Sequence, residues 1–311
     1  MKYRMLGKTK LKVSIVGVGT WQFGGAWGKD FTQDEVNAIL DKAADLGINL
    51  LDTAECYGHH LSESFIGNYM ESRRNRTNWI VATKFGHNHL DKKNPSKNYW
   101  SAEEVQNQLE ESLKALKTDY VDLYQFHSGP NEVFDNDDLW TMLDKQVQAG
   151  KVRNLAISIN KDGKDNLHQT DSASNINAKA IQVVYNRLDQ RAESEVFPSC
   201  QRQDLGVLAR VPLASGYLSG KYRPDAVFPE NDVRSRHDKE ETALKLKQVE
   251  EILRNEVPQG ASMAEWALAW CFKHPAVTCV IPGSKSPEQI EINAKAASFD
   301  FINDSHPQAW K

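Results

Sequence analysis

The sequence predicts a (β/α)8 barrel, in which eight parallel strands alternate with helices. Eight short runs rich in Val, Ile and Leu are separated by amphipathic stretches, as expected for strands buried on both faces. The 311 residues are sufficient for one such barrel, which takes about 250. We therefore expect residues 1–311 to form a single barrel domain. The eight runs are 15–18, 48–51, 80–83, 121–126, 152–157, 181–184, 207–209 and 277–281.

A doubly wound open sheet is the competing architecture, and its first turn usually carries G-x-G-x-x-G. This chain has Gly17-Val-Gly-Thr20 followed by Gly24-Gly25, which does not match that pattern. No acidic residue follows the second run in the ribose-binding role either, and this favours the barrel.

Three of the expected helices have readable boundaries. Residues 32–46 place apolar side chains on one face and are followed by Gly47, a typical C-terminal residue. Residues 101–116 open with Ser101-x-x-Glu104, which is a capping box. Residues 138–149 end before a glycine in the same way.

Two segments depart from the alternation of strands and helices. Residues 1–13 hold a Leu6-Gly7-Lys8-Thr9 turn between strand-like pieces, which predicts a β-hairpin ahead of the barrel. Residues 222–239 are rich in Pro and charge and have no helical period. A loop of that length in a compact domain is typical of a lid or of disorder.

Composition excludes several classes of protein. The net charge of −4 disfavours a protein that coats nucleic acid, since phosphate binding needs a basic surface. Four cysteines without a C-x-x-C pair predict neither a disulfide scaffold nor a zinc site. The longest stretch without charge, 13–28, is too short to span a bilayer, and the N-terminus lacks the apolar core of a signal peptide. We expect a cytoplasmic protein without nucleic-acid or membrane partners; its oligomeric state is not readable.

In a barrel, functional side chains gather where the strands end. Asp52 and Tyr57 follow the second run, Lys84 follows the third and His127 follows the fourth. A lone ammonium at the barrel mouth would be costly to desolvate, so we expect Lys84 to pair with Asp52. Taken singly, each residue has an ordinary structural interpretation, such as a helix cap, a loop aromatic, a surface charge or a core histidine.

Carbonyl reduction is the chemistry that fits this set. An acid must protonate the alkoxide that develops when hydride attacks a carbonyl carbon. An unperturbed Tyr has a pKa of about 10 and is a poor acid at neutral pH. A neighbouring ammonium such as that of Lys84 favours the phenolate and lowers the pKa.

Asp52-Thr-Ala-x-x-Tyr57-Gly58, Ala82-Thr-Lys84 and Gln125-x-His127 resemble the aldo-keto reductase family, and the resemblance covers essentially the whole chain. The bacterial branch with inositol and polyol dehydrogenases and general stress reductases is the most similar part. The resemblance implies that Tyr57 is the general acid and base, that Lys84 and Asp52 tune it, and that His127 positions the substrate.

The same resemblance implies a site for NADP(H). Ser158 and Gln182 match the positions that bind the nicotinamide carboxamide, and Arg210 stands where many members have an aromatic residue that stacks on the ring. A guanidinium can stack too, but its charge would weaken the preference for the oxidised, positively charged ring. Lys285, near a helix N-terminus, would meet the 2′-phosphate that NADP has and NAD lacks. The remaining implied cofactor residues are Pro212, Leu213, Ser215, Gly216, Lys221, Arg234, Gly283, Ser284, Gln289 and Asn293.

Aromatic residues and histidines in the loops over the mouth are expected to line the walls of the substrate site. His87 and His89 have a spacing found in metal sites, but no third ligand follows and no metal is expected. The expected wall residues are Trp21, Trp27, Phe85, His87 and Trp100.

The sequence thus predicts an NADP(H)-dependent oxidoreductase that interconverts a small aldehyde, ketone or sugar carbonyl and its alcohol. One alternative is a regulatory protein of the same fold that retains the cofactor as a sensor. Another is a sugar or polyol dehydrogenase that works mainly in the oxidative direction. A phosphate-binding isomerase or aldolase would need Lys84 as a nucleophile, unpaired from Asp52.

Overall fold

The computed structural model describes the chain except for residues 88–98, 162, 164, 300–304 and 311. One parallel sheet runs through eight strands in chain order, each paired with the next. The strands are β3 (Val18–Gly19), β4 (Leu50–Asp52), β5 (Ile80–Phe85), β6 (Leu123–His127), β7 (Leu155–Ser158), β8 (Ala178–Val184), β9 (Gly206–Arg210) and β10 (Cys279–Ile281).

The sheet closes on itself between its first and last strands. The amide of Gly17 donates to the carbonyl of Val280, and the amide of Gly19 donates to the carbonyl of Pro282, at 2.8 and 3.0 Å. Parallel bridges join Val16 to Val280 and Gly19 to Gly283. The predicted barrel is therefore confirmed. The expected first strand, 15–18, is represented by the two residues of β3, and Val16 before them forms one of these bridges to β10.

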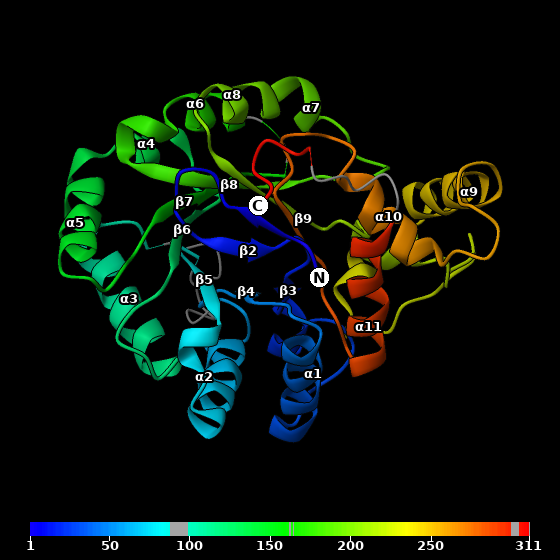
Figure 1. The fold of residues 1–311 in the computed structure, drawn as a ribbon, viewed down its shortest axis with the longest axis horizontal. Helices are drawn as coiled ribbons and strands as arrows, with labels where there is room; N and C mark the ends of the chain where they lie inside the picture. The colour runs from blue at the N-terminus through cyan, green and yellow to red at the C-terminus, as the bar shows by residue number, and fades with distance from the viewer. Residues whose placement is uncertain (88–98, 162, 164, 300–304, 311) are drawn as a thin grey trace.

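Helices surround the barrel (Figure 1). The three expected helices are present with shifts of one residue at their ends, and both Thr32 and Ser101 form capping boxes. The helix α9 lies outside the ring, at the right of Figure 1, and begins directly after the long loop. The helices are α1 (Gln33–Asp45), α2 (Leu61–Arg73), α3 (Ala102–Ala115), α4 (Asn131–Phe134), α5 (Asp137–Gln148), α6 (Asn166–Asp171), α7 (Ala192–Glu195), α8 (Phe197–Arg202), α9 (Lys239–Asn255), α10 (Met263–Cys271) and α11 (Pro287–Lys295).

The inside of the barrel is filled at one end. The antiparallel hairpin of β1 (Tyr3–Met5) and β2 (Lys12–Ser14), as predicted, lies across that end (Figure 1). Leu6 and Val13 of the hairpin segment pack on inward-facing residues of the strands and are fully buried. Polar chemistry is therefore left to the opposite end, where the strands have their carboxyl termini. The strand residues of this inner cluster are Leu50, Ala82, Leu123, Ala156, Ala180, Leu208, Cys279 and Ile281.

The long loop of 222–238 docks on the loop that follows β3. The amide of Val233 donates to the carbonyl of Ala26 at 3.0 Å, and the amide of Gly28 donates to the carbonyl of Asn231 at 3.2 Å. The loop contains a short 3-10 turn, Val233–Arg236, and is otherwise without helix, in line with the sequence. Within the described residues, none of the helices is both long enough and apolar enough to cross a bilayer.

Gly67 fixes the distance between α2 and α3, because a Cβ there would overlap the carbonyl oxygen of Ala115. Gly67→Ala should lower the free energy of unfolding by about 1–3 kcal/mol, the usual cost of overpacking. This loss would exceed the gain of about 1 kcal/mol that alanine has over glycine in helix propensity. Urea denaturation measures the change. Ser64→Ala, at a partly exposed position of α2, is the control and should stay within about 0.5 kcal/mol. An unchanged or increased stability of Gly67→Ala would contradict this packing.

Candidate active site

Three strand ends and one loop bring together the four side chains predicted to carry the chemistry. They are Asp52, Tyr57, Lys84 and His127. Lys84, fully buried at the end of β5, donates to Asp52 Oδ2 at 2.9 Å, which confirms the expected ion pair. The same Nζ donates to the carbonyl of Thr53 at 2.8 Å and to Tyr57 Oη at 3.1 Å. The ammonium therefore has three oxygen partners, and one of them is the candidate acid.

The second carboxylate oxygen of Asp52 is held by two amides. Gln182 Nε2 donates to Asp52 Oδ1 at 2.6 Å, and Gln125 Nε2 donates to the same oxygen at 3.1 Å. Gln182 Nε2 also lies 3.1 Å from Gln125 Oε1. Both amide side chains are buried, so the charge of Asp52 is surrounded by donors.

Sequence reasoning quoted Gln125 within a motif but gave it no role. The signal that would have found it is register, since Gln125 on β6 stands opposite Lys84 on β5. Residues at the same level of adjacent strands point to the same side of a sheet, so Gln125 must point where Lys84 points.

Burial dominates the electrostatics of the candidate acid. It raises the pKa of Tyr57 to about 12, although the Lys84 ammonium pulls that pKa down. The sequence expectation was right about the direction of the ammonium's effect, but the loss of hydration outweighs it. Burial lowers the pKa of Lys84, yet the charges of Asp52 and Tyr57 outweigh burial and the net shift is upward. Lys84 is thus held as a cation.

His127 and the aromatic side chains form a rim around Tyr57. The Nδ1 atom of His127 lies 3.8 Å from the Sγ atom of Cys56, and its ring centre lies 4.4 Å from that of His87, nearly perpendicular to it. Trp21 stacks on Tyr57 at 6.0 Å and is 38% exposed. The rim is therefore open to solvent on the Trp21 side.

Not all the expected wall residues face the mouth. Phe85 is fully buried and packs on Tyr124, Phe126 and Trp100, so its assignment to the substrate wall was wrong. Successive side chains of a strand point to opposite faces, and Lys84 occupies the inner one. Trp100 remains partly exposed beside His87, with 6.2 Å between ring centres.

Trp27 belongs to the rim and also to the contact between the loop after β3 and the long loop of 222–238. Its ring lies edge-on to that of Trp21 at 5.1 Å, whereas its backbone forms a bridge with Asp232. Lys285 Nζ donates to the carbonyl oxygen of Trp27. The predicted wall residue and the predicted phosphate ligand are thus in direct contact.

The implied carboxamide ligands lie side by side. Ser158 Oγ donates to Gln182 Oε1 at 3.4 Å, and both residues are buried at the ends of β7 and β8. Arg210, at the end of β9, donates from Nη2 to the carbonyl of Ile159 at 3.0 Å. The three positions therefore form one continuous polar edge next to Asp52.

The segment after β9 has a strained backbone. Val211, Ala214, Ser215 and Gly216 all have φ between +48° and +89°. Left-handed conformations are costly for residues other than glycine, and they persist where function requires them. Within the turn, the amides of Ala214 and Gly216 donate to the carbonyls of Val211 and Leu213, both at 2.9 Å. Pro212 and Leu213 lie inside this turn, and Lys221 beyond it is exposed.

Arg234, one of the implied cofactor residues, is paired with an acid. Both arms of its guanidinium bind Asp232, at 2.9 and 2.7 Å, and the pair is buried. Its Nη1 also donates to the carbonyl of Ser215 at 3.3 Å. The side chain therefore joins the long loop to the left-handed turn, and its charge is neutralised by an acid that sequence reasoning had not singled out.

The residues after β10 form a compact polar group. Gln289 Oε1 accepts from the amide of Lys285 at 2.9 Å, and Asn293 Nδ2 donates to Ser284 Oγ at 2.9 Å. The side chain of Gln22 packs directly against Gly283, where a Cβ would displace it. These implied cofactor residues thus lie in the segment before α11 and on α11 itself.

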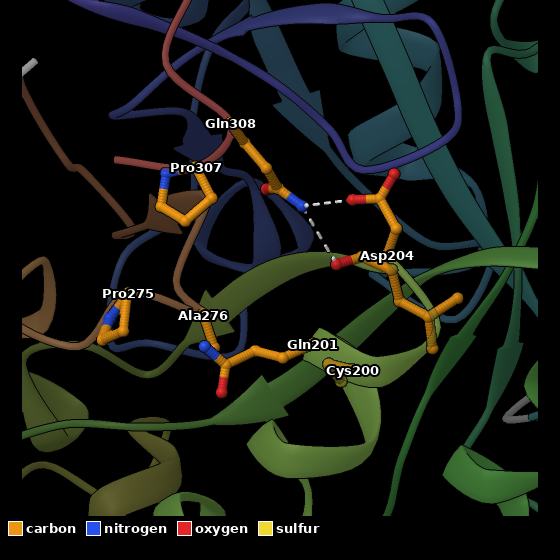
Figure 2. Close-up of a pocket in the computed structure, with 8 residues that line it drawn as sticks. Cys200, Gln201, Asp204, Pro275, Ala276, Pro307 and Gln308 are labelled. Atoms are coloured by element: carbon orange, nitrogen blue, oxygen red, sulfur yellow. Dashed lines mark hydrogen bonds between the residues drawn. The ribbon is translucent and has the colours of Figure 1, made fainter. Parts of the chain in front are cut away.

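Neither a metal cluster nor the described cavity adds to this site. His89 lies outside the described residues, and among those described no three His, Cys, Asp or Glu side chains are grouped to hold a metal. A cavity of about 260 Å³ lies at the other end of the barrel, by the hairpin, where Gln308 of the C-terminal segment donates to Asp204 and to the carbonyl of Leu205 at 3.4 Å (Figure 2). It contains none of the candidate residues.

Comparison with known proteins gives a consistent assignment. The sequence pattern of the aldo/keto reductase family matches residues 15–310. An aldo-keto reductase of Schizosaccharomyces pombe, yakc, whose name carries NADP(+), is 29% identical over 90% of this chain and 83% of its own. A putative voltage-gated potassium channel subunit beta of the same organism is 31% identical over 99% of this chain and 91% of its own. The solved structure of a glycerol dehydrogenase from Gluconobacter oxydans superposes with a TM-score of 0.78 at 26% identity, covering 95% of this chain and 90% of that chain.

The buried ion pair predicts strong energetic coupling. Lys84→Met should lower the free energy of unfolding by about 3–5 kcal/mol, because it leaves the buried Asp52 carboxylate without its counter-charge. Asp52→Leu should cost a similar amount. The double variant should be more stable than the sum of the two losses implies, since no unpaired charge remains.

Guanidinium denaturation of the four proteins measures this coupling. The exposed pair of Lys42 and Glu291, at 2.8 Å, gives the matched control, for which the coupling should stay below about 1 kcal/mol. Additive losses at Lys84 and Asp52 would show that the two charges are not energetically linked.

Proposed function

The chain belongs to the aldo/keto reductase family, and we propose that it is an NADP(H)-dependent oxidoreductase of small carbonyl compounds. Its substrates are an aldehyde, a ketone or a sugar carbonyl and the corresponding alcohol. The observation that carries the proposal is the contact of Lys84 Nζ with both Asp52 and Tyr57 Oη, beside the polar edge of Ser158, Gln182 and Arg210. The proposal includes a single barrel domain in the cytoplasm, with no nucleic-acid or membrane partner.

In this reaction Tyr57 is the proton donor. Its Oη gives a proton to the carbonyl oxygen as the alkoxide develops, and the phenolate that remains lies against the Lys84 ammonium. His127 donates to the same oxygen and holds the substrate at the mouth. When bound, the cofactor supplies the hydride. In the reverse direction the phenolate takes the proton from the alcohol.

The residues present suit a dinucleotide. Two enclosed donors, Arg210 Nε and Trp27 Nε1, have no hydrogen-bonding partner in the described part of the chain, and the segment that directly follows Arg210 is held in left-handed conformations. Lys285 stands beside Ser286, at the start of α11, where a helix N-terminus favours a phosphate. The NADP(+) in the name of the yakc relative supports the choice of NADP(H).

Two observations bear on the alternatives. The likeness to a putative channel subunit keeps a cofactor-sensing regulatory role as the second candidate, and the likeness to a glycerol dehydrogenase keeps the oxidative direction. An aldolase-type nucleophile is disfavoured because Lys84 Nζ already donates to three oxygens. Such an amine would have to lose a proton and its partners before it could attack.

A screen of both directions tests the proposed function. NADPH oxidation is followed with aldehydes and ketones, and NADP+ reduction is followed with sugars and polyols. We expect turnover in at least one series. Tight cofactor binding without turnover in either series would favour the regulatory role, and absence of cofactor binding would reject both.

Tyr57→Phe should keep cofactor binding and lose most of the turnover on a substrate found in the screen. The variant keeps the ring and removes only the proton donor, and general acid catalysis contributes about 10²–10⁴-fold. Turnover is measured as kcat, and cofactor binding is measured as the dissociation constant of NADPH. Tyr69→Phe, at a buried tyrosine of α2, is the control and should retain turnover. If Tyr57→Phe retains more than about a tenth of the activity, another residue is the acid.

Lys285→Ala should weaken the binding of NADPH much more than that of NADH. The 2′-phosphate is the feature that separates the two cofactors, and a charge-assisted contact is worth about 1.5–3 kcal/mol, or roughly ten- to a hundredfold in dissociation constant. Quenching of tryptophan fluorescence measures both constants, with Lys42→Ala as the charge-matched surface control. An equal loss for both cofactors would place Lys285 on the part of the molecule that they share.

A further inference from the structure

Arg210 is a cation at the barrel mouth without a neutralising partner. Its Nη2 donates to a backbone carbonyl, that of Ile159, and its Nε is enclosed with no hydrogen-bonding partner in the described part of the chain. Within the described ranges, no carboxylate forms an ion pair with it, whereas Lys84 and Arg234 each have one. Burial lowers the pKa of the Arg210 guanidinium, yet arginine stays charged in proteins. A full positive charge is therefore held in place there.

The strand register puts this charge beside the implied carboxamide ligands. Arg210 pairs with Val184, two residues after Gln182 on β8, and its hydrogen-bond acceptor Ile159 directly follows Ser158. Tyr57, Asp52 and Asp189 act electrostatically on the guanidinium and raise its pKa, so Arg210 shares the mouth with the candidate acid. Any ring whose carboxamide is held by Ser158 and Gln182 lies in the field of this guanidinium.

We propose that Arg210 sets the redox preference of the cofactor, by destabilising the positively charged oxidised nicotinamide relative to the neutral reduced form. The inference rests on the proposed function, since it requires a nicotinamide at Ser158 and Gln182. Two like charges in a partly desolvated site repel strongly, and the reduced ring carries no charge to be repelled. NADPH therefore binds more tightly than NADP+.

This preference has two consequences for turnover. The oxidised product leaves readily after carbonyl reduction, so product inhibition by NADP+ is weak. While it is bound, the oxidised ring is a stronger hydride acceptor than it is in water, because losing its positive charge relieves the repulsion. The bound couple thus has a more positive reduction potential, by about 30 mV for each tenfold difference between the two dissociation constants.

The enclosed Nε has a second possible partner, which is an anionic group on the substrate. A role toward the cofactor and a role toward the substrate predict different measurements. A guanidinium that acts on the cofactor changes the ratio of the NADP+ and NADPH dissociation constants in the absence of any substrate. A guanidinium that receives a substrate carboxylate leaves this ratio unchanged and raises KM for anionic carbonyl compounds only.

The test compares wild type with Arg210→Met, Arg210→Gln and Arg210→Lys. Dissociation constants of NADP+ and NADPH are measured by fluorescence quenching without substrate. In wild type we expect NADPH to bind at least about tenfold more tightly. In the Met and Gln variants this ratio should fall by about tenfold, mainly because NADP+ binds more tightly, whereas Arg210→Lys should stay within about threefold of wild type because it keeps the charge.

Lys221→Met is the matched control, because it removes an exposed cation implied to face the shared pyrophosphate. Both dissociation constants should rise together there, with their ratio unchanged. Circular dichroism checks that each variant is folded. If Arg210→Met does not fold, the comparison is made with Arg210→Gln. An unchanged ratio in a folded neutral variant overturns the role of Arg210, whether or not KM rises for anionic substrates. Failure of wild type to bind either cofactor would instead reject the proposed function.

Discussion

The ion pair of Lys84 and Asp52 is the interaction on which the candidate site depends. Removing two charges from water costs several kcal/mol per ion, and it is offset only where every remaining donor and acceptor is satisfied. Lys84 meets this condition with Asp52, Thr53 and Tyr57, and Asp52 meets it with Gln125 and Gln182. These partners come from β4, β5, β6, β8 and the loop after β4. The pair can therefore form only in a barrel whose register is correct, so that the fold and the chemistry specify each other.

The two cations at the mouth behave differently because only one of them is neutralised. The charge of Lys84 is balanced by Asp52, and its ammonium is in direct contact with the phenol of Tyr57. Arg210 is anchored by a neutral carbonyl, so its field extends into the space beside Ser158 and Gln182. In a site of low effective dielectric such a field is far stronger than in water. In the proposed function, Lys84 thus prepares the proton donor, and Arg210 acts on the cofactor that supplies the hydride.

The sequence was sufficient for the barrel and for the gathering of Asp52, Tyr57, Lys84 and His127 at one end of it, because both follow from the rule that parallel strands end at one face. It was not sufficient where the outcome depends on register, burial or loop docking. Phe85 was misplaced because strand alternation sends it outward when Lys84 points inward. The pKa of Tyr57 was misjudged because the extent of burial cannot be read from composition. Asp232 was overlooked because the sequence does not show that the side chain of Arg234 turns back onto it while the long loop docks on residues 26–28.

In the proposed NADP(H) site, loop docking also gives a physical basis for discrimination between NADP(H) and NAD(H). Lys285 is already hydrogen-bonded to the carbonyl of Trp27, and Asp232, which forms a bridge with Trp27, is already paired with Arg234. A phosphate that reaches Lys285 replaces a neutral acceptor with a charged one, and charge-assisted hydrogen bonds are about twice as strong as neutral ones. A cofactor without the 2′-phosphate leaves the lysine on Trp27 and loses only this difference. Selectivity at this position is therefore the gain from exchanging one acceptor for another, and it is set by the protein's own contact as much as by the phosphate.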